Sequence, residues 1–434
     1  MDNVKKPNTF IHFLIVFLTS FILGGFFPLF QAKNNVNNYD KSSEILENKN
    51  RDDLNLQKFW TVYDLLKEKY YSKGSIKKDD LMDGIISGMV KSLGDKHSSY
   101  MGIEETKKFN EVLSGDFEGI GAVVEKVETG IEIDMVLKGS PAIKAGVRKG
   151  DIILKANGIE LRELSLTEGV DKIKGPAGSQ VVLSILRIGE KDVLDINVTR
   201  DKINIPTVDS EIIIDGKNKK IGYIALNMYG DNTSKDFNLE LKKMKEADVA
   251  GLIIDLRDNG GGYLQAAVEV LSNFIKNGEV LVKTKYREVF NNIVYKSLND
   301  GDIFDKKIVI LINGNSASAS EITAGALRDY GKAILVGEKS YGKGSVQEPF
   351  LLSDGSLVKL TIAKWFTPKN VNIDEEGINP DIKVEFTKED YENLYDRQLE
   401  EAKKVLYDFI KLDSLQLTID KYSKKQELEK KEEK

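Results

Sequence analysis

The chain has 434 residues, enough for roughly three domains of ordinary size. Its 63 Lys+Arg and 69 Asp+Glu give a formal net charge of -6, which argues against a nucleic-acid-binding protein, since such proteins are expected to be basic. The absence of cysteine excludes disulfides, thiol nucleophiles and cysteine-ligated metal clusters, and the two histidines, His12 and His97, are too few for a multi-histidine metal site.

Residues 10–30 form a nearly continuous apolar segment without formal charge, directly after Lys5 and Lys6. About 20 such residues are what a helix needs to cross a bilayer. A signal peptide would share this pattern, but no A-x-A-like cleavage site follows, so a retained transmembrane signal-anchor is the favoured interpretation. Because basic flanks stay in the cytoplasm, we expect the rest of the chain on the extracytoplasmic side of the cell membrane.

The remaining sequence changes its pattern several times. Apolar residues at helical spacing predict helices between 54 and 100, short β-like runs punctuated by glycine follow, and strands then alternate with helices as in an α/β domain. The expected parts are a cytoplasmic N-terminus (1–9), the transmembrane segment (10–30), a polar linker (31–53), a helical segment (54–104), a β-rich module (105–200), an α/β core (201–390), and a C-terminal helix with a charged tail (391–434).

A serine-rich turn, residues 313–322, connects a buried-type strand at 308–312 to a helical stretch predicted over 323–330. Backbone N–H groups at the start of a helix can stabilise a developing oxyanion. A structural interpretation is also open, because Ser318 and Glu321 have the spacing of a helix capping box. The small residues around Ser318 leave open space that a cap does not require.

If Ser318 is a nucleophile, it needs a base, and a buried lysine held neutral is the natural substitute for a histidine. Lys343 is the best candidate, because the glycines on either side of it allow another backbone to approach closely. An exposed turn lysine is the alternative. Gln347 lies on the same strand face but about 13 Å from Lys343 in an extended strand, so contact requires a bend or two leaning side chains.

A second glycine-rich turn, residues 255–262, also follows a strand and could offer a backbone N–H to an oxyanion. It lacks the Gly-Lys-Ser/Thr of a phosphate-binding loop, and an ordinary turn remains the alternative.

In the β-rich module, Gly119-Ile120-Gly121-Ala122 introduces a strand expected at 123–127. Amides in such a loop, beside an exposed strand edge, can capture the terminal carboxylate of a peptide that adds as a further strand. A small β domain without a ligand is the alternative.

Together these motifs resemble those of the C-terminal processing peptidases, or tail-specific proteases, over about residues 54–385. The most specific match pairs Ser316-Ala-Ser-Ala-Ser-Glu-Ile322 with Tyr341-Gly-Lys-Gly-Ser-Val-Gln347, and further matches are Leu93-Gly-Asp-Lys-His-Ser-Ser-Tyr100, Gly139-Ser-Pro-Ala142 and Gly377-Ile-Asn-Pro-Asp381. Lys96 stands where the family usually has proline, and Gly260 stands at another family proline. The resemblance implies a crotonase/Clp-like α/β protease core with an inserted PDZ domain.

By the same resemblance Ser318 is the nucleophile, Lys343 the general base and Gln347 the residue that orients the lysine. Ala319 N–H and a glycine of Gly261-Gly262 would form the oxyanion hole. His97 would be structural, and a role for Lys174 in coupling the PDZ domain to the protease is in doubt, because relatives commonly have arginine there.

The predicted activity is therefore that of a membrane-anchored serine endopeptidase that needs no metal or cofactor and proceeds through an acyl-enzyme. Its expected partners are proteins with unstructured, apolar C-terminal tails, bound through residues 119–122, and helices at both ends of the soluble part could form a homodimer. The main alternative is a non-catalytic, membrane-tethered PDZ receptor for protein C-termini. An acyl-CoA enzyme of crotonase architecture is a third interpretation without specific sequence support.

Overall fold

The computed structural model describes residues 55–432, except 73, 75–76, 115, 138, 205–206, 215–217, 300, 302, 388, 391–392 and 394. The predicted transmembrane segment at 10–30, the N-terminus before it and the linker at 31–53 lie outside the described residues. Among the helices of the described part, none combines the length and the apolar character needed to cross a membrane.

A six-stranded sheet forms the core of the α/β domain, in the order β10-β11-β12-β15-β16-β19. All neighbours are parallel except the antiparallel pair β10 and β11. The strands are β10 (Val208–Ile214), β11 (Lys220–Leu226), β12 (Gly251–Asp255), β15 (Lys307–Ile312), β16 (Ala333–Gly337) and β19 (Ile382–Lys383).

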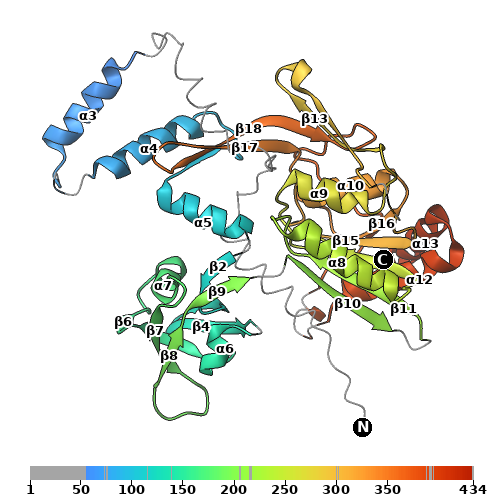
Figure 1. The fold of residues 1–434 in the computed structure, drawn as a ribbon, viewed down its shortest axis with the longest axis horizontal. Helices are drawn as coiled ribbons and strands as arrows, with labels where there is room; N and C mark the ends of the chain where they lie inside the picture. The colour runs from blue at the N-terminus through green and yellow to red at the C-terminus, as the bar shows by residue number, and fades with distance from the viewer. Residues whose placement is uncertain are drawn as a thin grey trace.

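Helices cover both faces of this sheet, which explains why its central strands are almost entirely buried and rich in apolar residues. One face packs against α8 (Thr233–Glu246), α9 (Leu264–Ser272) and α10 (Ala319–Asp329), and the other packs against α12 (Arg397–Leu412) and α13 (Leu415–Glu432) (Figure 1). Successive residues alternate between the two cores: Ile308 and Ile310 belong to the first, Val309 and Leu311 to the second.

The C-terminal region contains more structure than its charged composition indicated. Helix α13 extends through most of the segment expected to be a solvated tail, and its buried Tyr422 packs on the same core as α12. The hydroxyl of Tyr422 donates to Asp408 Oδ2 on α12 at 2.8 Å. A few inward-facing residues therefore fix a helix that is otherwise rich in lysine and glutamate.

A second sheet joins the N-terminal helical segment to the α/β domain. Strand β18 (Leu357–Phe366) pairs with β17 (Ser345–Leu351), with β13 (Val280–Tyr286) and with β1 (Ser99–Met101), while β14 (Ile293–Lys296) extends it beyond β13. The N-terminal helices are α3 (Gln57–Lys69), α4 (Lys78–Lys91) and α5 (Ile103–Ser114). Chain segments more than 250 residues apart thus share one sheet.

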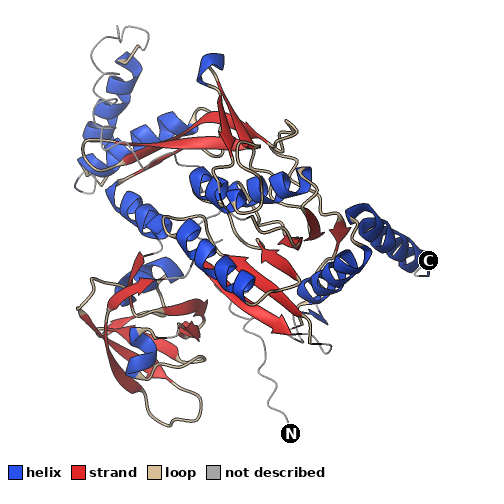
Figure 2. Ribbon diagram, turned by 45° about the vertical axis from the view of Figure 1, so that its right-hand side comes forward, coloured by secondary structure: helices blue, strands red, loops and turns tan. Residues whose placement is uncertain are grey.

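The β-rich module forms a separate lobe with its own apolar core (Figure 2). Its sheet has the order β3-β4-β5-β7-β8, with β6 beside β5, and it carries two short helices. These elements are β3 (Ala122–Val127), β4 (Gly130–Val136), α6 (Pro141–Ala145), β5 (Ile152–Ala156), β6 (Ile159–Glu160), α7 (Leu166–Ile173), β7 (Gln180–Leu186) and β8 (Leu194–Thr199). The lobe joins the rest of the chain through the antiparallel pair β2 (Asp116–Gly119) and β9 (Asp201–Asn204).

Candidate active site

Two turns that the sequence predicts separately lie against each other at one edge of the main sheet. Strands β12 and β15 are parallel neighbours, so the turns that follow them leave the sheet on the same side. The carbonyl of Asn259 accepts hydrogen bonds from Ala317 N at 3.0 Å and from Ser320 Oγ at 2.8 Å. The glycine-rich turn therefore supports the serine-rich turn directly.

Ser318 is the N-cap residue of α10 and is fully buried. Its backbone has φ 55° and ψ −113°, a region that non-glycine residues occupy at a cost of order 1–3 kcal/mol. The backbone N–H donates to Glu321 Oε2 at 2.8 Å, which is one half of the predicted capping box. The hydroxyl has no hydrogen-bond partner in the described part of the chain, so it is not consumed by the cap.

The carboxylate of Glu321 connects the serine turn to the lysine segment. Its Oε2 accepts from Ser318 N and from Lys343 N at 2.9 Å, and its Oε1 accepts from Gly342 N at 2.7 Å and Ser340 Oγ at 2.6 Å. Burial raises the pKa of Glu321, although these four donors act in the opposite direction. One carboxylate oxygen thus holds the backbone nitrogens of Ser318 and Lys343 on either side of it.

Lys343 is buried, with 4% of its surface exposed, and is not an exposed turn lysine. The two neighbouring glycines explain the burial: a Cβ on Gly342 would lie 2.8 Å from Gly377 N, and one on Gly344 would lie 2.6 Å from Asp374 N. Only glycine allows the loop at 372–377 to approach this closely. That loop therefore encloses the lysine segment.

Burial holds the pKa of Lys343 well below its ordinary value of 10.5, and the positive charge of Lys359 lowers it further. Glu321 and Asp95 act in the opposite direction without reversing the shift. A lysine of this kind is neutral in a larger fraction of molecules near neutral pH and can accept a proton.

Gln347 is fully buried on β17, beyond a bulge that shifts the register with β18 between Val346 and Gln347. Its Nε2 donates to Ser345 Oγ at 2.8 Å and Thr361 Oγ1 at 3.2 Å, and its Oε1 has no partner among the described residues. The expected orientation of the lysine by Gln347 therefore stays a prediction.

Of the three candidate oxyanion residues, Ala319 follows Ser318 directly and Gly261 lies against both of them, while Gly262 lies against Tyr229. A Cβ on Gly261 would be 2.8 Å from Ser318 Cβ and 3.0 Å from Ala319 N, so this position admits only glycine. Its own N–H donates to Asn259 Oδ1 at 2.9 Å. Gly262 has φ 137° and faces the Tyr229 carbonyl so closely that it too excludes a side chain.

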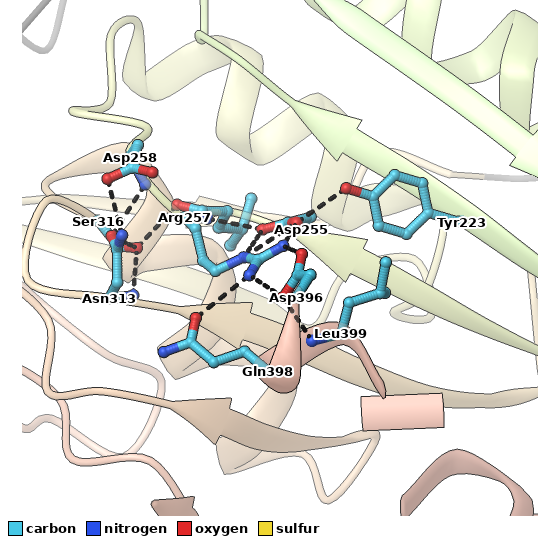
Figure 3. A network of polar contacts seen from close by, with 10 residues as sticks. Tyr223, Asp255, Arg257, Asp258, Asn313, Ser316, Asp396, Gln398 and Leu399 are labelled. Atoms are coloured by element: carbon cyan, nitrogen blue, oxygen red, sulfur yellow. Dashed lines mark hydrogen bonds and ion pairs between the residues drawn. The ribbon is translucent and has the colours of Figure 1, made fainter. Parts of the chain in front are cut away.

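Behind this turn, Arg257 forms the centre of a buried ion-pair network (Figure 3). Its guanidinium donates to Asp255 with a shortest distance of 2.6 Å and to both carboxylate oxygens of Asp396 at 2.8 Å, while Tyr223 Oη donates to Asp255 Oδ2. Burial alone would lower the pKa of Arg257, but the two carboxylates outweigh it and raise the pKa above its usual value. The N-cap residue of α12, Asp396, is thereby fixed to the glycine-rich turn at 255–262.

Three profiles of known families match the chain. The profile of peptidase family S41 matches residues 220–384, that of the N-terminal domain of the activating protease CtpB matches residues 22–106, and that of a PDZ domain matches residues 132–187. A CtpA-like serine protease of Staphylococcus saprophyticus is 36% identical over 391 residues, which cover 88% of this chain and 76% of the relative. The chain belongs to peptidase family S41. A CtpA-like serine protease of Staphylococcus aureus strain N315 is 38% identical over 343 residues, covering 79% of this chain and 67% of the relative.

The fold of this S41 serine peptidase is shared by a solved S41 protease from Bacteroides fragilis. The two are 20% identical, the match covers 75% of this chain and 89% of the other, and the TM-score is 0.53. The protein is therefore a serine peptidase with a PDZ domain, as the resemblance of its motifs indicated.

In the PDZ domain, Gly121 has φ 73°, and a Cβ there would lie 2.5 Å from Ser140 Cβ. The carbonyls of Gly121 and Ile120 accept from Leu137 N and Ala142 N, while the Ile120 side chain is buried in the PDZ core instead of lining a groove. Gly119 ends β2, and Ala122 begins β3, which is an edge strand of the sheet.

The surroundings of Lys343 include Lys359, which the sequence did not indicate, and Asp95 and His97 of the motif at 93–100, whose proximity to Lys343 the sequence did not indicate. Lys359 is fully buried, and the loop before β1 brings Asp95 and His97 towards Lys343. Burial and the neighbouring Lys343 lower the pKa of His97 to about 4, so His97 is neutral near neutral pH. These residues lie far from Lys343 in sequence, and no local pattern links them.

The unpartnered polar atoms are concentrated in the same region. Among the described residues, the buried side-chain atoms without a hydrogen-bond partner are His97 Nε2, Ser99 Oγ, Ser318 Oγ and Gln347 Oε1. Such atoms are rare in folded proteins and typical of functional sites. The described residues contain no group of three or more metal-ligating side chains.

Proposed function

We propose that this S41 peptidase is an endopeptidase that cleaves proteins through a Ser318–Lys343 acyl-enzyme mechanism and selects them by their C-terminal tails. The observation that carries the proposal is the arrangement around Glu321. Ser318 has a strained backbone and an unpartnered hydroxyl, and Lys343 is buried with a lowered pKa. The backbone N–H groups of both residues donate to the same carboxylate oxygen of Glu321.

In the proposed reaction, neutral Lys343 accepts the proton of Ser318 as Oγ attacks the peptide carbonyl. Ala319 N–H at the start of α10 and the glycine turn stabilise the oxyanion. Since Gly261 N–H is engaged by Asn259, we assign the second donor to Gly262. The protonated lysine then gives its proton to the leaving amine, and a water activated by Lys343 hydrolyses the acyl-enzyme.

The Gln347 amide would fix the lysine in position. Its Nε2 is held by Ser345 and Thr361, which leaves Oε1 as the acceptor available for an ammonium. The bulge in β17 and the length of the two side chains shorten the separation that a regular strand would impose.

Tail recognition belongs to residues 119–122 and strand β3 of the PDZ domain. An extended tail would pair with the free edge of β3, while the amides of the Gly119–Ala122 loop bind its terminal carboxylate. We propose that the tails are unstructured and apolar; the buried position of Ile120 means that other side chains must supply the apolar contacts.

The membrane location rests on the sequence alone: residues 10–30 would anchor the protease with its catalytic part on the extracytoplasmic side. A homodimer is supported by α3, which has no buried residue and exposes apolar side chains such as Trp60 and Leu65. Light scattering of the fragment 52–434 would show a molecular mass of two chains if this is right and one chain if it is not.

The activity is tested with the fragment 52–434 and an unfolded protein ending in an apolar residue. The parent should cleave with turnover, and Ser318→Ala and Lys343→Ala should not, while the exposed Lys339→Ala control keeps its activity. Circular dichroism and thermal unfolding establish that each variant is folded.

The result also separates the alternatives. Cleavage by a folded Ser318→Ala or Lys343→Ala variant would refute the Ser–Lys assignment. Tail binding by all proteins without cleavage by any would favour the PDZ receptor. Amidation of the substrate's terminal carboxylate should weaken binding, and equal binding of both forms would refute tail selection.

A further inference from the structure

Lys359 is a second buried lysine in the interior of the site. None of its surface is exposed, although a buried ammonium is costly and lysines are seldom found in cores. Burial lowers its pKa to about 8, and Asp95 acts in the opposite direction. The chain therefore keeps an ionisable group at a position from which solvent is excluded.

The register of the sheet places Lys359 on the face that carries Gln347. Lys359 lies opposite Ser99 of β1 and Pro349 of β17, while Thr361, two residues further along β18, lies opposite Gln347. Residues two apart on a strand, and their cross-strand partners, share a face. Gln347 Nε2 donates to Thr361 Oγ1 on this face.

Asp95 attaches the N-terminal segment to the same strand. Its Oδ2 accepts from Ser98 Oγ at 2.5 Å, and Ser98 Oγ in turn accepts from Thr361 N at 3.0 Å. Burial alone would raise the pKa of Asp95, but hydrogen bonds from Ser98, Thr361 and the His97 backbone lower it, so Asp95 is ionised. A partly buried, ionised carboxylate thus acts electrostatically on both lysines.

We propose that Lys359 is a positioning residue for the general base: its ammonium, retained in the interior by Asp95, repels a second positive charge and thereby keeps Lys343 neutral. This inference rests on the proposed Ser–Lys function. It assigns the two lysines different states at neutral pH, with the proton on Lys359 and none on Lys343.

The other charges around Lys343 fit this division. Glu321 on α10 and Asp95 in the loop before β1 favour a protonated Lys343, whereas His97 in that loop is neutral and Lys359 on β18 opposes protonation. Glu321 already accepts four hydrogen bonds from other groups. Lys359 supplies a positive charge that opposes protonation of Lys343.

The test is the pH profile of kcat/KM for the fragment 52–434, whose acidic limb, on which activity rises with pH, reports the ionisation of the base in the free enzyme. Lys359→Met and Lys359→Gln both remove the charge, and both should raise the midpoint of that limb by about one pH unit. At one pH unit below the parent's midpoint, we compare kcat/KM as a fraction of each protein's own plateau value. This fraction should be several-fold smaller for each variant than for the parent.

Lys359→Arg separates charge from shape. Arginine remains protonated at every accessible pH, so the repulsion persists and the midpoint should not rise. Lys285→Met on the neighbouring strand β13 removes an exposed lysine and serves as the matched control with an unchanged midpoint. If Lys359→Met does not fold, Lys359→Gln and Lys359→Arg still give opposite expectations.

The outcomes distinguish this inference from the proposed function. Two results would overturn the role of Lys359 while leaving the Ser–Lys mechanism intact. In the first, both neutral variants lose activity but the midpoint of the pH profile does not move. In the second, Lys359→Arg raises the midpoint as much as the neutral variants do. A parent profile in which activity does not rise with pH on the acidic side, or an active Lys343→Ala variant, would instead refute the Ser–Lys mechanism itself.

Discussion

The geometry of the site depends most on one residue, Glu321, through its carboxylate. It accepts four hydrogen bonds from the nucleophile and lysine segments while it is itself buried. The capping-box spacing indicated its contact with Ser318, but its contacts with Gly342 and Lys343 depend on how two distant segments meet. A residue predicted as a local cap therefore also aligns Ser318 with Lys343, the proposed nucleophile and base.

Glu321→Gln is expected to lower both stability and activity. The new NH2 group would face donors where an oxygen now accepts them, so two donors lose their acceptor. We expect a loss of about 2–4 kcal/mol in the free energy of unfolding, measured by chemical denaturation. The exposed Glu376→Gln serves as the control, and an unchanged Glu321→Gln stability would contradict the assigned contacts.

At the scale of elements, the sequence predicted the strands that precede the site better than the contacts between their turns. The apolar runs of β12 and β15 and the glycines after them are local signals, and the structure has both strands near the expected positions. Helix α10 starts at Ala319, four residues before the helical stretch predicted over 323–330. Ser318 is its N-cap residue, so the first turn precedes the residues on which that prediction was based.

Contacts between distant elements had no local signal. Arg257 meets Asp396 across 139 positions, and β1 meets β18 across more than 250. The sequence indicated that Lys343 needs a close neighbour, because of its flanking glycines, but it did not identify that neighbour as the loop at 372–377. Lys359 has no such marker, since a lysine in an apolar strand is also typical of an exposed sheet face.

The PDZ loop at 119–122, which we propose binds the tail carboxylate, gives a prediction at this scale. Gly121→Ala would place a Cβ 2.5 Å from Ser140 Cβ at a positive φ, whereas Gly150→Ala would meet only the positive φ, since nothing lies within 4 Å of its Cβ. In a Ser318→Ala background, tail-peptide anisotropy should show binding weakened at least tenfold by Gly121→Ala and little by Gly150→Ala. Equal effects would show that the loop does not bind the tail.

At the scale of the whole molecule, the PDZ domain is joined to the S41 core by a two-stranded ribbon. Gly119 and Asp201 are register partners in β2 and β9, so the domain between them enters and leaves at one point (Figure 1). The N-terminal segment, by contrast, contributes β1 to a sheet of the core and Asp95 to the site. Removal of the PDZ domain should therefore disturb the S41 core less than removal of the N-terminal segment.

Replacing residues 120–200 by a two-residue turn should leave hydrolysis of a short amidated peptide within a few-fold of the parent. The same replacement should abolish the preference for a free C-terminal carboxylate, because it removes residues 120–122 of the loop at 119–122. Competition between free and amidated tails measures that preference. A folded variant that still prefers the free tail would place tail recognition outside the PDZ domain.

The central claim is that Lys343 activates Ser318, and covalent labelling with a fluorophosphonate followed by peptide mass spectrometry tests it most directly. The adduct should be found on the peptide that contains Ser318, at a rate that rises with pH as Lys343 loses its proton, and Lys343→Ala should label far more slowly at pH 8. An adduct on another serine, or labelling of Lys343→Ala at the parent's rate, would contradict the account.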